Sequence, residues 1–200
     1  MINKLMNVTE SNPMYAEITK GLDNLTDEDL VIVGRSFKNR KDERIKPLAV
    51  KNKVYFYLAY DLDGKTAYPT KFTPEQVEKA KQNMLRRAVM GSMLEMMFST
   101  GTPLKEFKPS GDPMNVVTMD SHMYGAGLLF CEEFFVQMEK KFGEFYILPS
   151  SVNELIIAPK QRGTSRDKLT QIVKEVNASV VDENDFLADK AFTRKDWEWK

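Results

Sequence analysis

Histidine and cysteine, the side chains that most readily act as a base or a nucleophile near neutral pH, are rare in this 200-residue chain. The sequence has a single histidine, His122, and a single cysteine, Cys131. Asp120, Ser121 and His122 stand in a row and include the three residue types of a serine hydrolase triad. Adjacent side chains point in divergent directions, and no second histidine can act as a base elsewhere. The sequence therefore predicts no catalytic residue here, and we expect Asp120 or Ser121 to cap a following helix.

Motifs for metals and nucleotides are incomplete as well. One cysteine and one histidine cannot supply the ligands of the usual zinc sites, nor an internal disulfide. Gly64-Lys65-Thr66 ends like a phosphate-binding loop, but Ala59 stands where that loop needs its first glycine. Gly125-Ala126-Gly127 has Phe130 at the third glycine position of a dinucleotide fingerprint, so close helix packing is the better explanation of its glycines. We expect neither a cofactor nor a metal.

A basic stretch has the composition of a surface that contacts phosphate groups. Residues 35–53 hold eight lysines and arginines against two acidic residues, a local net charge of +6 in a chain of zero formal charge. Arg40, Lys41 and Arg44 are the candidate contacts to a nucleic acid or another partner. The alternative, which the interspersed acidic residues favour, is a solvated loop or linker.

Methionines are concentrated in a second stretch. Five of the 12 methionines fall between Met84 and Met97. Methionine side chains adapt to different partners, so Met90, Met93 and Met97 are candidate contacts to another protein. The alternative is a helix that is buried on most of its sides.

The pattern of apolar residues predicts the elements that position these groups. Strands are expected over residues 30–33, 54–60, 66–70, 115–119, 145–148 and 154–158. Helices are expected over residues 15–22, 74–98, 128–142 and 169–176. Asp63-Gly64 predicts a hairpin turn, and Pro69 places the returning strand at an edge of its sheet. Thr73-Pro74 with Gln76 predicts a capped helix start, and Gly143 predicts a helix end.

These elements predict an α+β fold with a mixed, largely antiparallel sheet flanked by about three main helices. Residues 1–46 are expected to form an N-terminal extension or small subdomain, and residues 47–200 the α+β domain. Apolar residues make up 42% of the chain and charged residues 29%, a globular composition without an apolar run that could span a membrane. The N-terminus lacks the apolar core of a signal peptide, so we expect a cytoplasmic location and a buried, inert Cys131.

The second half of the chain carries a family resemblance. Its residues are Val116-Val117-Thr118-Met119, Tyr124-Gly125-Ala126-Gly127, Phe145 to Ile157 with the sequence ILPSS-x-x-E, Val173 to Asn177 and Asp185 to Asp189. Over residues 47–195 the chain resembles an uncharacterised family of small cytoplasmic proteins, carried mainly by Gram-positive gut bacteria and their mobile elements. Members of that family often have histidine where this chain has Asn153, which argues against a catalytic imidazole there. The resemblance implies a domain type and a genomic habitat, but no reaction.

The strongest block of that resemblance has a structural interpretation. Leu148-Pro149 predicts the end of a strand, and Ser151 and Glu154 are spaced like a capping box. A structural connector explains this pattern. The alternative is a surface recognition loop that presents Ser150 and Ser151 to a partner.

Taken together, these residues favour a non-enzymatic protein that binds another macromolecule, most simply a protein. One alternative is a phage or mobile-element product that inhibits a host defence nuclease, in the manner of an anti-CRISPR protein, with the nuclease or its RNA complex as partner. A second alternative is a hydrolase that uses paired carboxylates or Ser151. Binding to nucleic acid is disfavoured by the zero net charge, and no membrane partner is expected.

Overall fold

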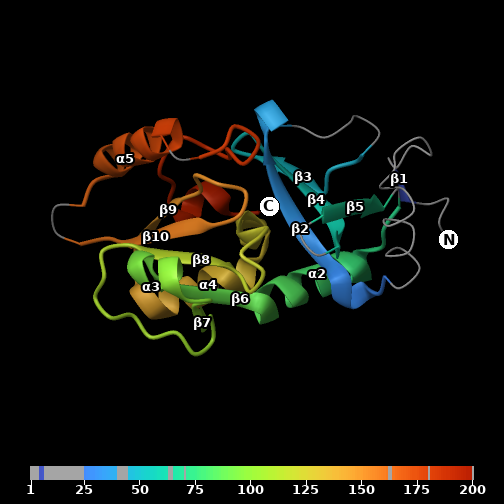
Figure 1. Ribbon diagram of the computed structural model, residues 1–200, viewed down its shortest axis with the longest axis horizontal. Helices are drawn as coiled ribbons and strands as arrows, with labels where there is room; N and C mark the ends of the chain where they lie inside the picture. The colour runs from blue at the N-terminus through green and yellow to red at the C-terminus, as the bar shows by residue number, and fades with distance from the viewer. Residues whose placement is uncertain are drawn as a thin grey trace.

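The computed structural model describes residues 5–6, 25–39, 45–62, 65–69, 71–161, 164–179 and 181–199 (Figure 1). The helix expected over residues 15–22 and the turn at Asp63-Gly64 lie outside these residues. Arg40, Lys41 and Arg44, the candidate contacts of the basic stretch, lie outside them too.

The first sheet is built around the long strand β4 (Val54–Leu62). β2 (Leu30–Ser36) pairs antiparallel with β4 along all of its seven residues. β5 (Lys65–Pro69) and β3 (Ala49–Lys51) pair with the two ends of the other edge of β4, and β1 (Leu5–Met6) pairs with β5. The strands predicted over residues 30–33 and 54–60 are therefore confirmed, and β2 shares a sheet with β4 although it precedes residue 47.

The edge position predicted for the returning strand is wrong. β5 lies between β4 and the two-residue β1, and Leu5 is opposite Pro69. Pro69 is tolerated because the ladder between β5 and β4 ends at Ala67, so the missing N–H removes none of its bonds.

The second sheet has five antiparallel strands in the order β7-β6-β8-β10-β9. These strands are β6 (Ala88–Ser92), β7 (Thr102–Pro103), β8 (Asn115–Met119), β9 (Phe145–Leu148) and β10 (Leu155–Pro159). β8, β9 and β10 confirm three predicted strands. The chain has an α+β fold, as predicted, but its strands form two antiparallel sheets and not one mixed sheet.

Among the described residues the helices are α2 (Pro74–Arg87), α3 (Met93–Phe98), α4 (Glu132–Phe142) and α5 (Arg166–Ser179). The same residues include the short 3-10 helices η2 (Asp27–Asp29), η3 (Phe37–Asn39), η4 (Gly125–Phe130) and η5 (Arg194–Trp197). The capping box of Thr73 and Gln76 at the start of α2 is confirmed, and so is the end of α4 at Gly143. No helix in the described ranges combines the length and apolar character that crossing a membrane requires.

The single helix predicted over residues 74–98 is wrong beyond Arg87. After Arg87 the chain becomes β6, which pairs with β8 from Ala88 opposite Met119 to Ser92 opposite Asn115. Gly91 is a poor helix former, and burial of Ala88, Val89 and Met90 between strands outweighs their local helix preference.

The main core lies where the first sheet packs on α2, η4, α4 and the second sheet, and a smaller core lies where α5 covers the second sheet. In Figure 1 the first sheet lies to the right of the second, and α5 lies at the left. Cys131 is 1% exposed in the main core, and burial raises the pKa of its thiol to about 12. The prediction of a buried cysteine is confirmed.

Two glycines of η4 allow the sheets and loops to approach each other. A β-carbon at Gly127 would lie 1.9 Å from the carbonyl oxygen of Ile32 in β2, and one at Gly125 would lie 2.5 Å from the carbonyl oxygen of Asn153. Close packing as the reason for these glycines is thus confirmed.

Residues Thr193–Trp199, here named the closing segment, pack against both η4 and the first sheet. Trp197 is completely buried. The indole N–H of Trp199 donates to the carbonyl oxygen of Leu129 at 2.9 Å, and its ring lies edge-on to Phe56 with centroids 5.4 Å apart. The Asn52 amide donates to the carbonyl oxygen of Asp196 at 2.8 Å. The closing segment therefore contacts η4, β4 and the turn between β3 and β4.

Candidate functional site

α3 is a six-residue helix at the side of the second sheet that is distant from the first sheet (Figure 1). Its start is fixed by a capping box. The Ser92 hydroxyl oxygen accepts a hydrogen bond from the Glu95 backbone N–H at 3.2 Å, and the Glu95 carboxylate accepts one from the Ser92 N–H at 2.7 Å. These two bonds satisfy backbone donors that a short helix otherwise leaves free.

Met96 anchors α3 to the sheet. Its side chain packs against the smaller core, which includes Val116 and Ile156. A β-carbon at Gly91 would lie 3.0 Å from the Met96 sulfur, and one at Gly101 would lie 2.6 Å from it. The two glycines thus leave room for the thioether, and the orientation of α3 is set by one inward side chain.

The other apolar residues of α3 face solvent. Met93 is 46% exposed, Leu94 68%, Met97 74% and Phe98 81%. We call these four residues the α3 surface. They are half of the eight large hydrophobic residues that are exposed among the residues described; the other four, Phe37, Val50, Val136 and Ile172, come from different elements. Soluble monomers rarely expose apolar side chains in contiguous groups, so the α3 surface is a candidate interface.

The structure separates the three methionines predicted as partner contacts. Met93 and Met97 lie on the α3 surface, as a role in binding requires. Met90 lies in β6 and is fully buried between β7 and β8, so it belongs to the core and a partner cannot reach it. Sequence reasoning missed Leu94 and Phe98, because their helical spacing from Met84 favoured a buried face.

The serines of the ILPSS stretch are also buried. Ser150 is 2% exposed and Ser151 is 9% exposed. The Ser151 hydroxyl oxygen accepts a hydrogen bond from the Asn153 N–H at 3.0 Å, which closes a turn and not a helix cap. The neighbouring backbone pairs with residues 185–188. The stretch is therefore a structural connector, as predicted. The alternative, a surface recognition loop that presents Ser150 and Ser151, is wrong because both serines are buried.

The described part of the basic stretch contacts other parts of the fold, while the loop expected around Arg40, Lys41 and Arg44 lies outside the described residues and stays a prediction. The described part contains η3, β3 and the turn into β4. The Lys51 ammonium group donates to the carbonyl oxygen of Glu198 and lies 5.2 Å from the centroid of the Trp199 ring. Lys38 lies 5.1 Å from the centroid of the Phe186 ring. These two lysines contact residues 186–199, and no local sequence pattern predicts this contact.

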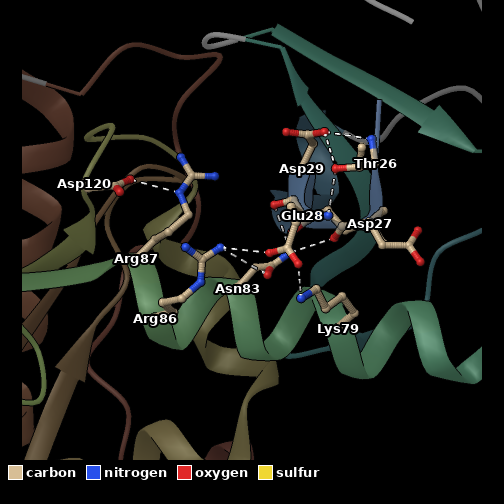
Figure 2. Close-up of polar contacts among 10 residues, drawn as sticks. Thr26, Asp27, Glu28, Asp29, Lys79, Asn83, Arg86, Arg87 and Asp120 are labelled. Atoms are coloured by element: carbon tan, nitrogen blue, oxygen red, sulfur yellow. Dashed lines mark hydrogen bonds and ion pairs between the residues drawn. The ribbon is translucent and has the colours of Figure 1, made fainter. Parts of the chain in front are cut away.

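Asp120 does not cap a helix. Its carboxylate accepts a hydrogen bond from Arg87 Nε at 3.0 Å (Figure 2). A second guanidinium nitrogen of Arg87 lies 3.1 Å from the Asp61 carboxylate. Burial lowers the pKa of Arg87, but the bonds to Asp120 and Asp61 outweigh it and raise the pKa overall. Arg87 thus joins β4 to the end of β8 as a permanent cation. His122 is exposed.

A polar network fastens η2 to α2. Figure 2 shows Glu28 facing Lys79 and Arg86, with which it forms ion pairs. Asn83 is 1% exposed, and its amide group donates to the carbonyl oxygens of Asp27 at 2.8 Å and Leu30 at 3.1 Å. Every one of these groups has a partner within the fold, so the network positions elements and offers no free group for chemistry.

Glu154 is a largely buried carboxyl group, and its surroundings increase its affinity for a proton. Burial raises its pKa above the ordinary value of 4.5, and the nearby His122 partly offsets this effect. The folded state therefore holds the proton more tightly than the unfolded state. The stability that this group contributes is fully present below pH 4.5 and is lost as the pH rises through the raised pKa.

Replacing Glu154 with glutamine is expected to raise the free energy of unfolding at neutral and alkaline pH. Glutamine has no charge to desolvate. The free energy of unfolding of the variant therefore does not fall when the pH rises above the pKa of the Glu154 carboxyl group. Urea denaturation at about pH 4 and about pH 8 measures the effect, and the gain of the variant over wild type should be larger at the higher pH. An equal difference at both pH values would contradict the prediction.

The described residues contain no group of three or more histidine, cysteine, aspartate and glutamate side chains placed to hold a metal ion. The hydrolase alternative gains no support from the geometry either. Ser151 is buried and its hydroxyl oxygen accepts a backbone hydrogen bond, while the one histidine of the chain, His122, is exposed.

Comparison with curated proteins gave no match, and comparison with solved structures gave none. Comparison with protein families gave a match over residues 16–193, to a family of unknown function, DUF5688. The match begins well before residue 47, where the resemblance read from the sequence began, and it includes β2. Bacterial habitat and the role of the ILPSS stretch in the family stay predictions. Because the match covers most of its length, the chain belongs to the family of unknown function DUF5688.

Proposed function

We propose that this protein acts by binding another protein through the α3 surface. The observation that carries the proposal is the exposure of Met93, Leu94, Met97 and Phe98 side by side on one helix. Residues four apart on a helix are neighbours, so Leu94 lies beside Phe98 and Met93 beside Met97. Burial of apolar surface stabilises a complex by about 25 cal/mol per Å², and such clusters supply the centre of protein interfaces.

The chemistry of α3 favours a protein over a nucleic acid. Its one charged residue is Glu95, an acid, so the helix offers no cation to a phosphate backbone. A convex apolar helix fits an apolar groove on a partner, the arrangement in which a helix is recognised by side chains spaced three and four apart. Methionine and leucine side chains can adjust to such a groove at little conformational cost.

The α3 surface is also held ready for binding. The capping box at Ser92 and the anchoring of Met96 fix the helix in the unbound protein. A partner therefore loses little free energy in ordering α3, which raises the affinity obtained from a small surface.

Photo-crosslinking in the cell of origin tests the proposal. A photoreactive amino acid placed at Leu94 or Met97 is expected to capture one discrete protein. Matched positions on other elements, Val136 on α4 and Ile172 on α5, are also apolar and exposed, and the same probe there should not capture it. Capture patterns that are the same at all four positions would overturn the proposal, and capture only of a second copy of this chain would replace it with self-association.

The purified complex allows a quantitative control. The double substitution Leu94→Glu with Phe98→Glu should weaken binding by at least about tenfold, because it places charges in an apolar contact. Val136→Glu should leave the affinity unchanged. Both variants should keep the wild-type unfolding temperature, since all three side chains are exposed. If the captured partner is a defence nuclease or its RNA complex, the protein is an inhibitor of the kind that a mobile element carries.

A further inference from the structure

A cleft of about 590 Å³ lies between the end of β2, the turn from β3 to β4 and the segment 186–192. Its lining includes three lysines, Lys38, Lys53 and Lys190, and three phenylalanines, Phe37, Phe186 and Phe192. We call it the lysine cleft. It is separate from the α3 surface, which lies on the second sheet. Its volume is in the range of cavities that hold small ligands.

The walls of the lysine cleft are fixed by contacts between distant parts of the chain. The Asn39 amide donates to the carbonyl oxygen of Glu183 at 2.6 Å, and the Asn52 amide donates to that of Asp196 at 2.8 Å. The backbone N–H of Phe37 donates to the carbonyl oxygen of Lys53 at 2.9 Å, which ties η3 to the turn. The cleft is thus preformed, and a ligand need not organise it.

The charge of the lysine cleft favours an anion. Its lining holds three lysines and one carboxylate, Asp189. In the parts of the chain that the structure describes, Lys38, Lys53 and Lys190 form no ion pair with a carboxylate. Lys38 lies over the Phe186 ring, and Lys190 lies 4.8 Å from the centroid of the Phe192 ring. The rings hold two ammonium groups at the cleft without neutralising them.

A buried hydroxyl group lies at the same place. Ser36 lines the cleft and is 2% exposed. Its oxygen accepts a hydrogen bond from the Asn39 N–H at 3.3 Å, which leaves the hydroxyl hydrogen to donate to a ligand oxygen. Lysine ammonium groups and a hydroxyl are the donors that bind phosphate, while the phenylalanine rings offer an apolar wall to the organic part of a ligand.

We propose that the lysine cleft binds a small organic phosphate of about the size of a mononucleotide. The acidic residues Asp182, Glu183 and Asp185 directly precede Phe186 and would repel a long polyanion. They leave the three lysines free to pair with a single phosphate group. This site is independent of the proposed protein interface, and either can fail without the other.

Isothermal titration of the full chain at low and at near-physiological salt tests the site. The probes are AMP and ribose 5-phosphate, with adenosine and ribose as their unphosphorylated counterparts. At least one phosphate compound is expected to bind saturably with a stoichiometry of one, and its counterpart should bind at least about tenfold more weakly. Binding should weaken as salt rises, because the contact is between exposed charges.

A pair of lysine variants locates the binding. Lys38→Gln with Lys190→Gln should reduce the affinity for the phosphate compound by at least about tenfold. Lys105→Gln with Lys108→Gln removes the same charge from exposed residues of another loop and should leave the affinity unchanged. Equal unfolding temperatures without ligand show that both variants fold.

Three results would overturn the proposal: no saturable binding of either phosphate compound, equal affinity in the two double variants, or equal affinity for phosphorylated and unphosphorylated probes. Tighter binding of an eight-nucleotide RNA than of AMP, lost in the Lys38 and Lys190 variant, would also overturn it and would assign the cleft to nucleic acid.

Discussion

Replacing Trp197 with alanine is expected to lower the free energy of unfolding by about 3–5 kcal/mol, the usual cost of removing a large aromatic side chain from a core. Trp197 is completely buried. Its ring lies 5.1 Å from that of Phe192 and 6.1 Å, edge-on, from that of Phe56, measured between centroids. The cavity left by the substitution would open where the closing segment meets the first sheet. Urea or guanidinium denaturation measures the loss.

Trp197→Phe provides the matched control. The indole nitrogen of Trp197 is buried and has no hydrogen-bond partner among the described residues, so its removal costs no bond. Phenylalanine keeps most of the ring contacts, and the loss should be well below that of the alanine variant. Equal losses for the two variants, or an alanine variant within about 1 kcal/mol of wild type, would show that Trp197 does not support the core in this way.

Gly127→Ala is expected to destabilise the protein by at least about 3 kcal/mol, at the upper end of the cost of overpacking. The new methyl carbon would lie 1.9 Å from the carbonyl oxygen of Ile32 and 2.8 Å from the Met84 methyl group. The methionine can move, but Ile32 is held in β2 by its pairing with Leu58 of β4. η4 would therefore have to withdraw from the sheet. Thermal unfolding followed by circular dichroism measures the effect.

Gly34→Ala is a milder substitution at the same contact between β2 and η4. Its methyl carbon would meet the Ala126 β-carbon at 3.3 Å and no backbone atom among its nearest neighbours. The Ala126 β-carbon moves only with the η4 backbone, but a shift of a few tenths of an ångström relieves this contact, so the variant should lose about 1 kcal/mol or less. If both glycine variants lost the same stability, the close approach of two backbones would not be the reason for Gly127.

The elements predicted well from the sequence carry local signals. Thr73, Pro74 and Gln76 mark the start of α2 because a helix start needs side-chain partners for its free N–H groups. The runs of β-branched and aromatic residues in β4 and β8 indicate strands whatever their neighbours are. Such signals depend on a few adjacent residues, and tertiary contacts do not alter them.

The transition from α2 to β6 could not be predicted in this way. Met84, Ala88, Gly91, Leu94 and Phe98 follow helical spacing, although they belong to a helix, a strand and a second helix. The strand forms because β8, almost thirty residues later, offers it a partner. Periodicity reports which residues are apolar, but it cannot report a partner that lies far along the chain.

The candidate sites show the same division. The concentration of methionines correctly indicated that Met93 and Met97 are exposed. It did not indicate that β6 interrupts the helix, which places Met90 in the core and Leu94 and Phe98 on the surface. The lysine cleft joins residues 36–38 and 52–53 to residues 186–192, so neither part of the sequence alone indicates a cavity.

The closing segment has a consequence for synthesis. It leaves the ribosome after every element that it contacts, and its partners Lys51 and Asn52 have by then been outside for more than a hundred residues of translation. Until it arrives, Phe56 and Phe130 lack the indole rings that cover them. The core around these two phenylalanine rings therefore stays incomplete in the nascent chain until Trp197 and Trp199 have emerged.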